Sequence, residues 1–139
     1  MTTRTINSFS LVATAPCHRE AALAIWSIRR NYDQPVLVIC DDETETYLNA
    51  KGFKDVYCKT EANQEDLDKL HLEVATTNDF HQPGPIFKKM DVIEWAVNDT
   101  GNTFFIDADV VLLNTVHEDI THPVMLSPHH HPPTRKGED

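Results

Sequence analysis

The feature that most constrains the fold is a pair of acids set between two apolar runs, in the stretch TFFIDADVVLLN at residues 103–114. Apolar residues come directly before and directly after the acids Asp107 and Asp109. A carboxylate buried among strand-forming residues is costly unless its charge is compensated, and residues two apart share one face of an extended segment. The stretch therefore predicts a strand over residues 103–113 that presents a site for a divalent cation.

The chemistry of the two acids suits a hard cation. Mg²⁺ and Mn²⁺ take oxygen ligands, often one or two carboxylates together with substrate phosphates. Asp107 and Asp109 supply this minimum, and Ala108 between them is small enough to let a ligand approach. The alternative is that two acids merely end a strand at a solvated edge, but the apolar runs on both sides favour the metal site.

Extended and helical patterns alternate along the chain upstream of the acids. Short runs of β-branched, aromatic and aliphatic residues predict strands, and apolar residues at helical spacing predict amphipathic helices. In chain order we expect a strand at 8–14, a helix at 19–31, a strand at 35–40, a helix at 44–50, a weak strand at 55–58, a helix at 63–77, a loop at 78–85, a helix from 85 to about 98–102, the acid-bearing strand at 103–113 and a strand at 123–127.

This alternation predicts an α/β fold built in layers around a mainly parallel sheet. Residues 1–128 are expected to form one domain, and residues 129–139, which are polar and rich in Pro and His, a flexible tail. Ligands of such sheets bind beyond the carboxyl ends of the strands. The candidate site residues are those that follow predicted strands: Thr14 with Ala15, Asp41 with Asp42, Asp107 with Asp109, and Ser127 with His129.

Charge and cysteine content limit the partners and the compartment. The chain has 22 acidic and 12 basic residues, a formal charge of −10, which disfavours a nucleic-acid backbone or an anionic membrane as the main partner. No segment approaches the roughly 20 apolar residues of a membrane span. The three cysteines have no CxxC spacing and are expected to be reduced thiols, so we predict a cytoplasmic protein.

Three segments of the chain together resemble one known family. They are FFIDADVVLLN, the preceding helix IFKKMDVIEWAV, and SLVATAP followed by REAALAIWSIRRN. These segments are similar to the DxD segment, the lysine-bearing helix, and the first strand, nucleotide loop and first helix of GT-A fold glycosyltransferases, above all the glycogenin-like retaining enzymes. The resemblance covers about residues 9–127 and implies a three-layer, Rossmann-like GT-A fold, of which this chain holds the N-terminal, donor-binding half.

The resemblance also implies a function for the acids and for a lysine. The chain would be a metal-dependent glycosyltransferase that moves a sugar from a nucleoside-diphosphate sugar to an unknown acceptor. Asp107 and Asp109 would hold Mn²⁺ or Mg²⁺ against the diphosphate, with Ala108 lining the same place. Lys89 matches the helix lysine and would approach the diphosphate or the donor sugar. Lys88 takes that role if the register shifts by one, and a solvated lysine is an equal alternative for either.

The loops after the first two strands complete the implied donor site. Ala13, Thr14 and Ala15 match the loop that lines the base and ribose of the nucleotide in the family. Asp41, at the end of the second strand, is either a further contact to the base or, as we favour, an ordinary loop acid. The resemblance assigns no catalytic residue within this chain.

The length of the chain leaves other interpretations open. Family members usually continue well beyond the point where this chain stops, so we expect a fragment, a reduced domain, or a domain completed by another chain in an oligomer. A non-catalytic nucleotide-sugar-binding or remnant domain is the main alternative. A sugar-phosphate nucleotidyltransferase ranks lower, because it needs a Gly-rich phosphate loop where this chain has ATAPCHRE.

Overall fold

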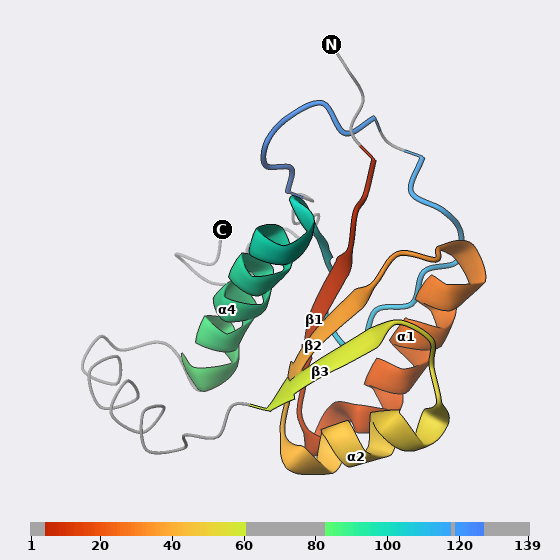
Figure 1. Ribbon diagram of the computed structural model, residues 1–139, viewed down its shortest axis with the longest axis vertical. Coiled ribbons are helices and arrows are strands. Elements are labelled where there is room, and N and C mark those ends of the chain that lie inside the picture. Colours follow the sequence, from red (N-terminus) through yellow and green to blue (C-terminus); the bar gives the residue numbers. More distant parts are fainter. Residues whose placement is uncertain (1–4, 61–82, 118, 127–139) are drawn as a thin grey trace, which may run out of the picture.

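A four-stranded parallel sheet forms the centre of the protein (Figure 1). The computed structural model describes residues 5–60, 83–117 and 119–126, without the side chains of residues 83–87. All pairings between the described strands are parallel, as the alternation of strand and helix predicts. The strands lie in the order β3-β2-β1-β4, and they are β1 (Phe9–Ala13), β2 (Val36–Cys40), β3 (Val56–Thr60) and β4 (Phe104–Phe105).

Helices cover both faces of the sheet, so the fold has three layers (Figure 1). The short 3₁₀ helix η1 (Ala15–Cys17) leads from β1 into α1 (His18–Asn31), which lies with α2 (Asp42–Lys51) on one face; α4 (Pro83–Thr100) lies on the other. Successive side chains of a strand point to opposite faces, and β1 and β2 accordingly feed two cores. One core contains Phe9, Leu11, Val36, Val38, Ala21, Ala24, Ile25 and Ile28, and the other Leu37, Ile39, Val92 and Ala96.

The predicted α/β class and parallel sheet are confirmed in this part of the chain. The first two strands and the first helix differ from their predicted bounds by no more than one residue at either end, and β2 is buried throughout, as its continuous apolar run PVLVIC indicates. The second helix begins at Asp42, two residues earlier than predicted, and ends at Lys51. Its C-cap, Gly52, has a φ of 68°, the left-handed conformation that is common after a helix end.

α4 begins earlier than its sequence pattern indicates. It starts at Pro83, two residues before the predicted start at Pro85, so the predicted loop is wrong at residues 83 and 84. Proline is tolerated in the first turn of a helix, because the N–H that it lacks would have no helical partner there. The predicted helix at 63–77, residues 78–82, and the expected boundary between a domain ending at 128 and a tail at 129–139 lie outside the described residues.

The strand predicted at 103–113 is mostly wrong, since only Phe104 and Phe105 are strand. The backbone N–H of Val110 donates to the carbonyl oxygen of Asp107 at 3.0 Å, and this turn takes the chain out of the sheet. Within the apolar run that follows, Leu112 packs against the core on the α1 side, whereas Val110, Val111 and Leu113 are exposed. The N–H of Leu112 donates to the hydroxyl of Ser27 at 2.9 Å, so its partner is a helix side chain.

The C-terminal strand predicted at 123–127 is also wrong over its described part. Residues 123–126 have no strand structure, and their side chains are exposed. Their apolar composition is therefore not sufficient to make them a strand. Residue 127 lies outside the described residues.

Side-chain hydrogen bonds help to hold β4 beside β1, because only two of its residues are paired. Ser8 donates through its hydroxyl to the carbonyl oxygen of Asn102 at 2.9 Å. The side-chain oxygen of Asn102 accepts from the N–H of Asn7 at 2.8 Å. Beyond β4, the N–H of Ile106 donates to the carbonyl oxygen of Ser10 at 3.0 Å. These contacts set the level at which Asp107 leaves the sheet.

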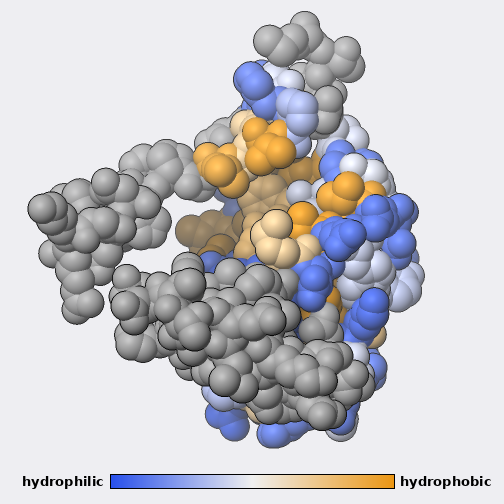
Figure 2. Space-filling view, turned by 90° about the vertical axis from the view of Figure 1, so that its left-hand side faces the viewer, coloured by the Kyte–Doolittle hydropathy of each residue, from blue (hydrophilic) through white to orange (hydrophobic). Residues whose placement is uncertain are grey.

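The outer face of α4 has a mixed character. Figure 2 shows hydrophobic groups among hydrophilic ones on this side of the molecule, and Met90 and Val97 of α4 are exposed apolar side chains. No helix within the described ranges is both long enough and apolar enough to cross a membrane.

Candidate functional site

The strand order singles out one place at the carboxyl edge of the sheet. From β1 the chain moves outward through β2 to β3, and it then returns to the other side of β1 as β4. β1 and β4 are therefore neighbours at the point where the strand order reverses, and the last residue of β4, Phe105, pairs with Ser10 near the start of β1. Open α/β sheets bind their ligands at such a point. Thr14 and Ala15 follow β1 there, and Asp107 to Asp109 follow β4.

The turn after β4 exposes both acids of the candidate metal site. Asp107 and Asp109 are exposed, whereas Ala108 between them is half-buried and packs against the core on the α1 side. The expectation that the acids are buried within a strand is therefore wrong, and the cost of burying a carboxylate does not apply to them. What remains of that prediction is a pair of solvent-accessible carboxylates anchored by a small apolar residue.

A lysine of α4 reaches the first acid of the pair. Lys89 Nζ lies 2.7 Å from Asp107 Oδ1, and the exposed fractions of the two side chains are 40% and 52%. The ammonium group also lies 5.8 Å from the centre of the Phe105 ring. Phe105 packs with the α4-side core, so α4, β4 and the turn bring a cation and an acid to the same place. Of the two adjacent lysines, Lys89 is the one at the acid pair.

Asp41 binds two backbone N–H groups at this edge of the sheet. Its Oδ1 accepts the N–H of Thr44 at 2.9 Å, which caps α2, and its Oδ2 accepts the N–H of Ala15 at 2.7 Å. Burial raises the pKa of Asp41, but the hydrogen bonds from Thr44 and Ala15 and the positive charge of Lys88 outweigh it, so the pKa lies below its ordinary value. Both carboxylate oxygens are already engaged by backbone groups.

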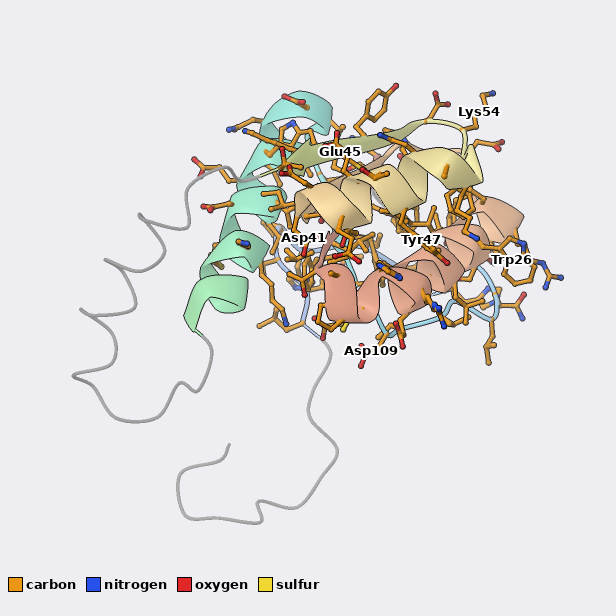
Figure 3. All side chains as sticks on the ribbon, turned by 90° about the horizontal axis from the view of Figure 1, so that it is seen from below. Trp26, Asp41, Glu45, Tyr47, Lys54 and Asp109 are labelled. Carbon is orange, nitrogen blue, oxygen red and sulfur yellow. The ribbon has the colours of Figure 1, made fainter. Side chains whose placement is uncertain are left out.

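Asp41 and Asp109 differ in their surroundings although both follow strands of the same sheet. Figure 3 shows Asp41 beside the first turn of α2 and Asp109 apart from it, near the rim of this end of the molecule. The sequence contains a signal for the role of Asp41 as the N-cap of α2, because Asp is a preferred N-cap residue directly before a helix. A helix predicted to begin at residue 44 leaves Asp41 too far upstream to be its N-cap.

The loop after β1 offers fewer groups to a ligand than the resemblance implies. The side chain of Ala13 is 2% exposed and belongs to the α1-side core. The N–H of Ala15 is bound to Asp41, and the N–H of Cys17 donates to the carbonyl oxygen of Thr14 at 2.8 Å. Thr14 is half-buried, and it is the residue of this loop whose polar side chain comes directly after β1.

The three cysteines are free thiols. Cys40 of β2 is buried, and its hydrogen bond with Cys58 together with its burial raises the pKa of Cys40. A thiol held in its protonated form is a poor nucleophile. Cys17, near the end of β1, is exposed. The hydrogen bond from Cys40 lowers the pKa of Cys58 and outweighs the burial of that thiol, which raises it.

The donor set at the turn fits a hard cation that is completed by a ligand. Among the residues that the structure describes, no group of three or more His, Cys, Asp or Glu side chains could hold a metal ion. Mg²⁺ commonly binds through one or two carboxylates, with waters and substrate phosphates in its other positions. Two exposed aspartates match that requirement.

No protein-family model matches the chain, and no curated protein matches it.

Proposed function

We propose that this chain is a metal-dependent glycosyltransferase of the GT-A type, or its donor-binding half, and that it binds a nucleoside-diphosphate sugar at the carboxyl ends of β1 and β4. The observation that carries the proposal is the 2.7 Å ion pair between Lys89 and Asp107. It brings a group for phosphate and a group for a cation together where the strand order reverses. A diphosphate chelated to a divalent cation needs both kinds of group.

Each residue of the site has a definite task in this proposal. Asp107 and Asp109 hold Mn²⁺ or Mg²⁺, and Lys89 binds the diphosphate. The bound cation would neutralise the charge that grows on the leaving nucleoside diphosphate as the glycosidic bond breaks. Lys89 would favour the same departure through its positive charge, because an ammonium group stabilises an anion more strongly as its charge increases.

The nucleoside would extend from the diphosphate toward the loop after β1. In this proposal Thr14 lines the base or the ribose, and the buried side chain of Ala13 supports the loop. Asp41 contributes indirectly, because its bond to the N–H of Ala15 fixes the path of that loop. We therefore assign Asp41 a positioning role in place of a contact to the base.

The loop after β1 suits a sugar-phosphate nucleotidyltransferase less well than a glycosyltransferase. That reaction class needs a loop of available backbone N–H groups to cradle phosphates. Here the N–H groups of Ala15 and Cys17 are already bound within the protein. The other alternative, a module that binds nucleotide-sugars without turning them over, uses the same groups as the proposed enzyme and is separated from it by experiment.

The proposal is tested by calorimetric titration of the chain with UDP-, GDP- and ADP-sugars, with and without Mn²⁺, and by measuring release of the nucleoside diphosphate. We expect at least one donor to bind only with Mn²⁺ and to be slowly hydrolysed, with water as the acceptor. Saturable binding without release of the nucleoside diphosphate would instead identify a binding module. If no donor binds more tightly with Mn²⁺ than without it, both the enzyme and the metal-dependent binding module are refuted.

A further inference from the structure

We infer that Lys89 is a built-in competitor of the metal ion, so that the cation and the diphosphate bind to this site together and each binds poorly alone. This inference rests on the proposed function, because it concerns the same acid pair. It adds a property that a pair of exposed acids does not have by itself: the protein alone discriminates against a bare divalent cation.

The ion pair occupies one of the two Asp107 oxygens that a cation would use. Lys89 Nζ lies 2.7 Å from Asp107 Oδ1, which is direct contact between the charged groups. A divalent cation bound to Asp107 would lie next to the ammonium group and be repelled by it. The cation can bind Asp107 only if the lysine moves away or if the like charges are compensated.

The pair is also able to exchange. The two side chains are 40% and 52% exposed, and an ion pair exposed to this extent is weak, because water solvates both partners. Lys89 can therefore leave Asp107 at little cost once another anion is present. A diphosphate provides that anion, since it carries several negative charges that both the cation and the ammonium group can share.

This arrangement makes the two binding events cooperative. A diphosphate that draws Lys89 away from Asp107 opens the acid for the cation, and a cation on Asp107 leaves Lys89 without a partner until a diphosphate arrives. Coupling between two ligands is reciprocal, so each must increase the affinity of the other by the same factor. The neighbouring Lys88 does not share this role, because its charge acts on Asp41.

The test compares Lys89→Gln with Lys88→Gln, which removes the same charge one residue away. Binding of Mn²⁺ alone is measured by the loss of the electron paramagnetic resonance signal of aqueous Mn²⁺. Binding of the preformed Mn²⁺–pyrophosphate complex is measured by calorimetry. We expect Lys89→Gln to bind Mn²⁺ alone about two- to fivefold more tightly than the wild type, which is the range of an exposed ion pair. We expect Lys88→Gln to stay close to the wild type.

The complex should respond in the opposite direction. Lys89→Gln should bind Mn²⁺–pyrophosphate more weakly than the wild type, because the phosphate loses its ammonium partner. A lysine with a merely structural role would not give these opposite signs. Circular dichroism of each variant checks that the fold is retained, as is expected for a substitution at an exposed position.

The outcomes separate this inference from the proposed function. If the wild type binds Mn²⁺–pyrophosphate but Lys89→Gln binds Mn²⁺ alone no more tightly than Lys88→Gln does, competition by Lys89 is refuted and the metal–diphosphate site stands. If neither the wild type nor any variant binds Mn²⁺ or its pyrophosphate complex, the inference and the proposed function are both refuted.

Discussion

Asp41 and the Asp107–Asp109 turn are both acidic ends of parallel strands, yet they are held in different ways. Asp41 accepts two backbone N–H groups, one on each carboxylate oxygen, from Thr44 and Ala15. Asp107 is paired with a half-exposed lysine side chain, and Asp109 is exposed. One acid is tied to the backbone that it organises. The other two face solvent, and the partner of Asp107 is a side chain that can move.

The difference separates acids that build the edge of the sheet from acids that can serve a ligand. A carboxylate that already accepts a fixed backbone N–H on each oxygen has fewer lone pairs to offer a cation than a carboxylate without such partners. A carboxylate in an exposed ion pair can exchange its partner, because such pairs contribute little free energy. Position after a strand is therefore insufficient to identify a site residue, and the partners of each oxygen decide its role.

The largest expected effect concerns the exposed acids and metal-dependent binding. Asp107→Asn or Asp109→Asn should reduce the Mn²⁺-dependent affinity for a nucleoside diphosphate by at least about tenfold, since even residues that only support metal ligands are typically worth 10–100-fold in affinity. The free energy of unfolding should stay within about 0.5 kcal/mol of the wild type, as for most surface substitutions. Calorimetry and urea denaturation measure the two quantities.

The control for this prediction is Asp33→Asn, which removes the same charge from an exposed residue just before β2, at the opposite edge of the sheet. It should leave Mn²⁺-dependent binding unchanged. An equal loss in Asp33→Asn would attribute the effect to net charge, and unchanged binding in both turn variants would remove the acids from the site.

The second prediction concerns Asp41, where we expect a substitution to lower the free energy of unfolding. Asp41→Ala should lower the free energy of unfolding by about 1–3 kcal/mol, because it removes the cap of α2 and leaves the partly buried N–H of Ala15 without its partner. Asp42→Ala, at the exposed neighbouring acid, should cost only about 0.5 kcal/mol through the helix dipole. Urea denaturation distinguishes them, and equal losses would contradict a specific cap.

A smaller effect is expected from Lys89, which in this proposal binds the diphosphate beside the metal-binding acids. Lys89→Ala should weaken Mn²⁺-dependent binding of a nucleoside diphosphate by about three- to tenfold, which is within the range of one typical hydrogen bond, about 0.5–1.5 kcal/mol. Binding of the corresponding nucleoside should change less, because it has no phosphate. Lys88→Ala is the matched control. Equal losses for nucleoside and diphosphate would place Lys89 away from the phosphates.

The smallest effect is the pH dependence that Asp41 gives to stability. Its pKa is lowered in the folded protein, so its stabilising contribution is complete above the unfolded pKa of about 4 and is lost as the pH falls through the folded value. The difference in free energy of unfolding between the wild type and Asp41→Asn should therefore be constant above about pH 5 and shrink below about pH 4. A difference that does not change down to pH 3 would contradict this account.

The sequence predicted the elements whose burial is local or continuous. The run from Val36 to Cys40 is apolar at every position and is buried at every position, and such a run has few alternatives to a covered parallel strand. The helix that follows β1 was equally clear, because its apolar residues recur at helical spacing. These elements, with the parallel sheet that connects them, are confirmed.

The errors came from contacts between residues far apart in the chain. The apolar run that begins at Val110 looks like the continuation of a strand, but Leu112 bonds to Ser27 of α1, 85 residues away, and the N–H of Val116 donates to the hydroxyl of Tyr32 at 2.6 Å. Periodicity cannot distinguish an apolar segment that pairs with a strand from one that packs on a helix. For the same reason, periodicity does not predict that Asp107 is exposed.

The candidate site was predictable in its composition but not in its geometry. The acid pair and the lysine of the preceding helix were identified from the sequence, whereas the contact between Lys89 and Asp107 depends on how α4 lies across the sheet. The role of Asp41 required knowing that two amides, from different loops, converge on its two oxygens. Neither arrangement can be derived from residue spacing alone.

The most direct test of this division between acids is a crystal structure of the chain with Mn²⁺ and a nucleoside diphosphate, in which anomalous scattering locates the metal. We predict a Mn²⁺ peak within direct coordination distance of the carboxylate oxygens of Asp107 and Asp109, with Lys89 moved from Asp107 to the diphosphate and Asp41 still bound to Thr44 and Ala15. A Mn²⁺ peak at Asp41, or a metal-bound nucleotide away from the turn after β4, would contradict the account.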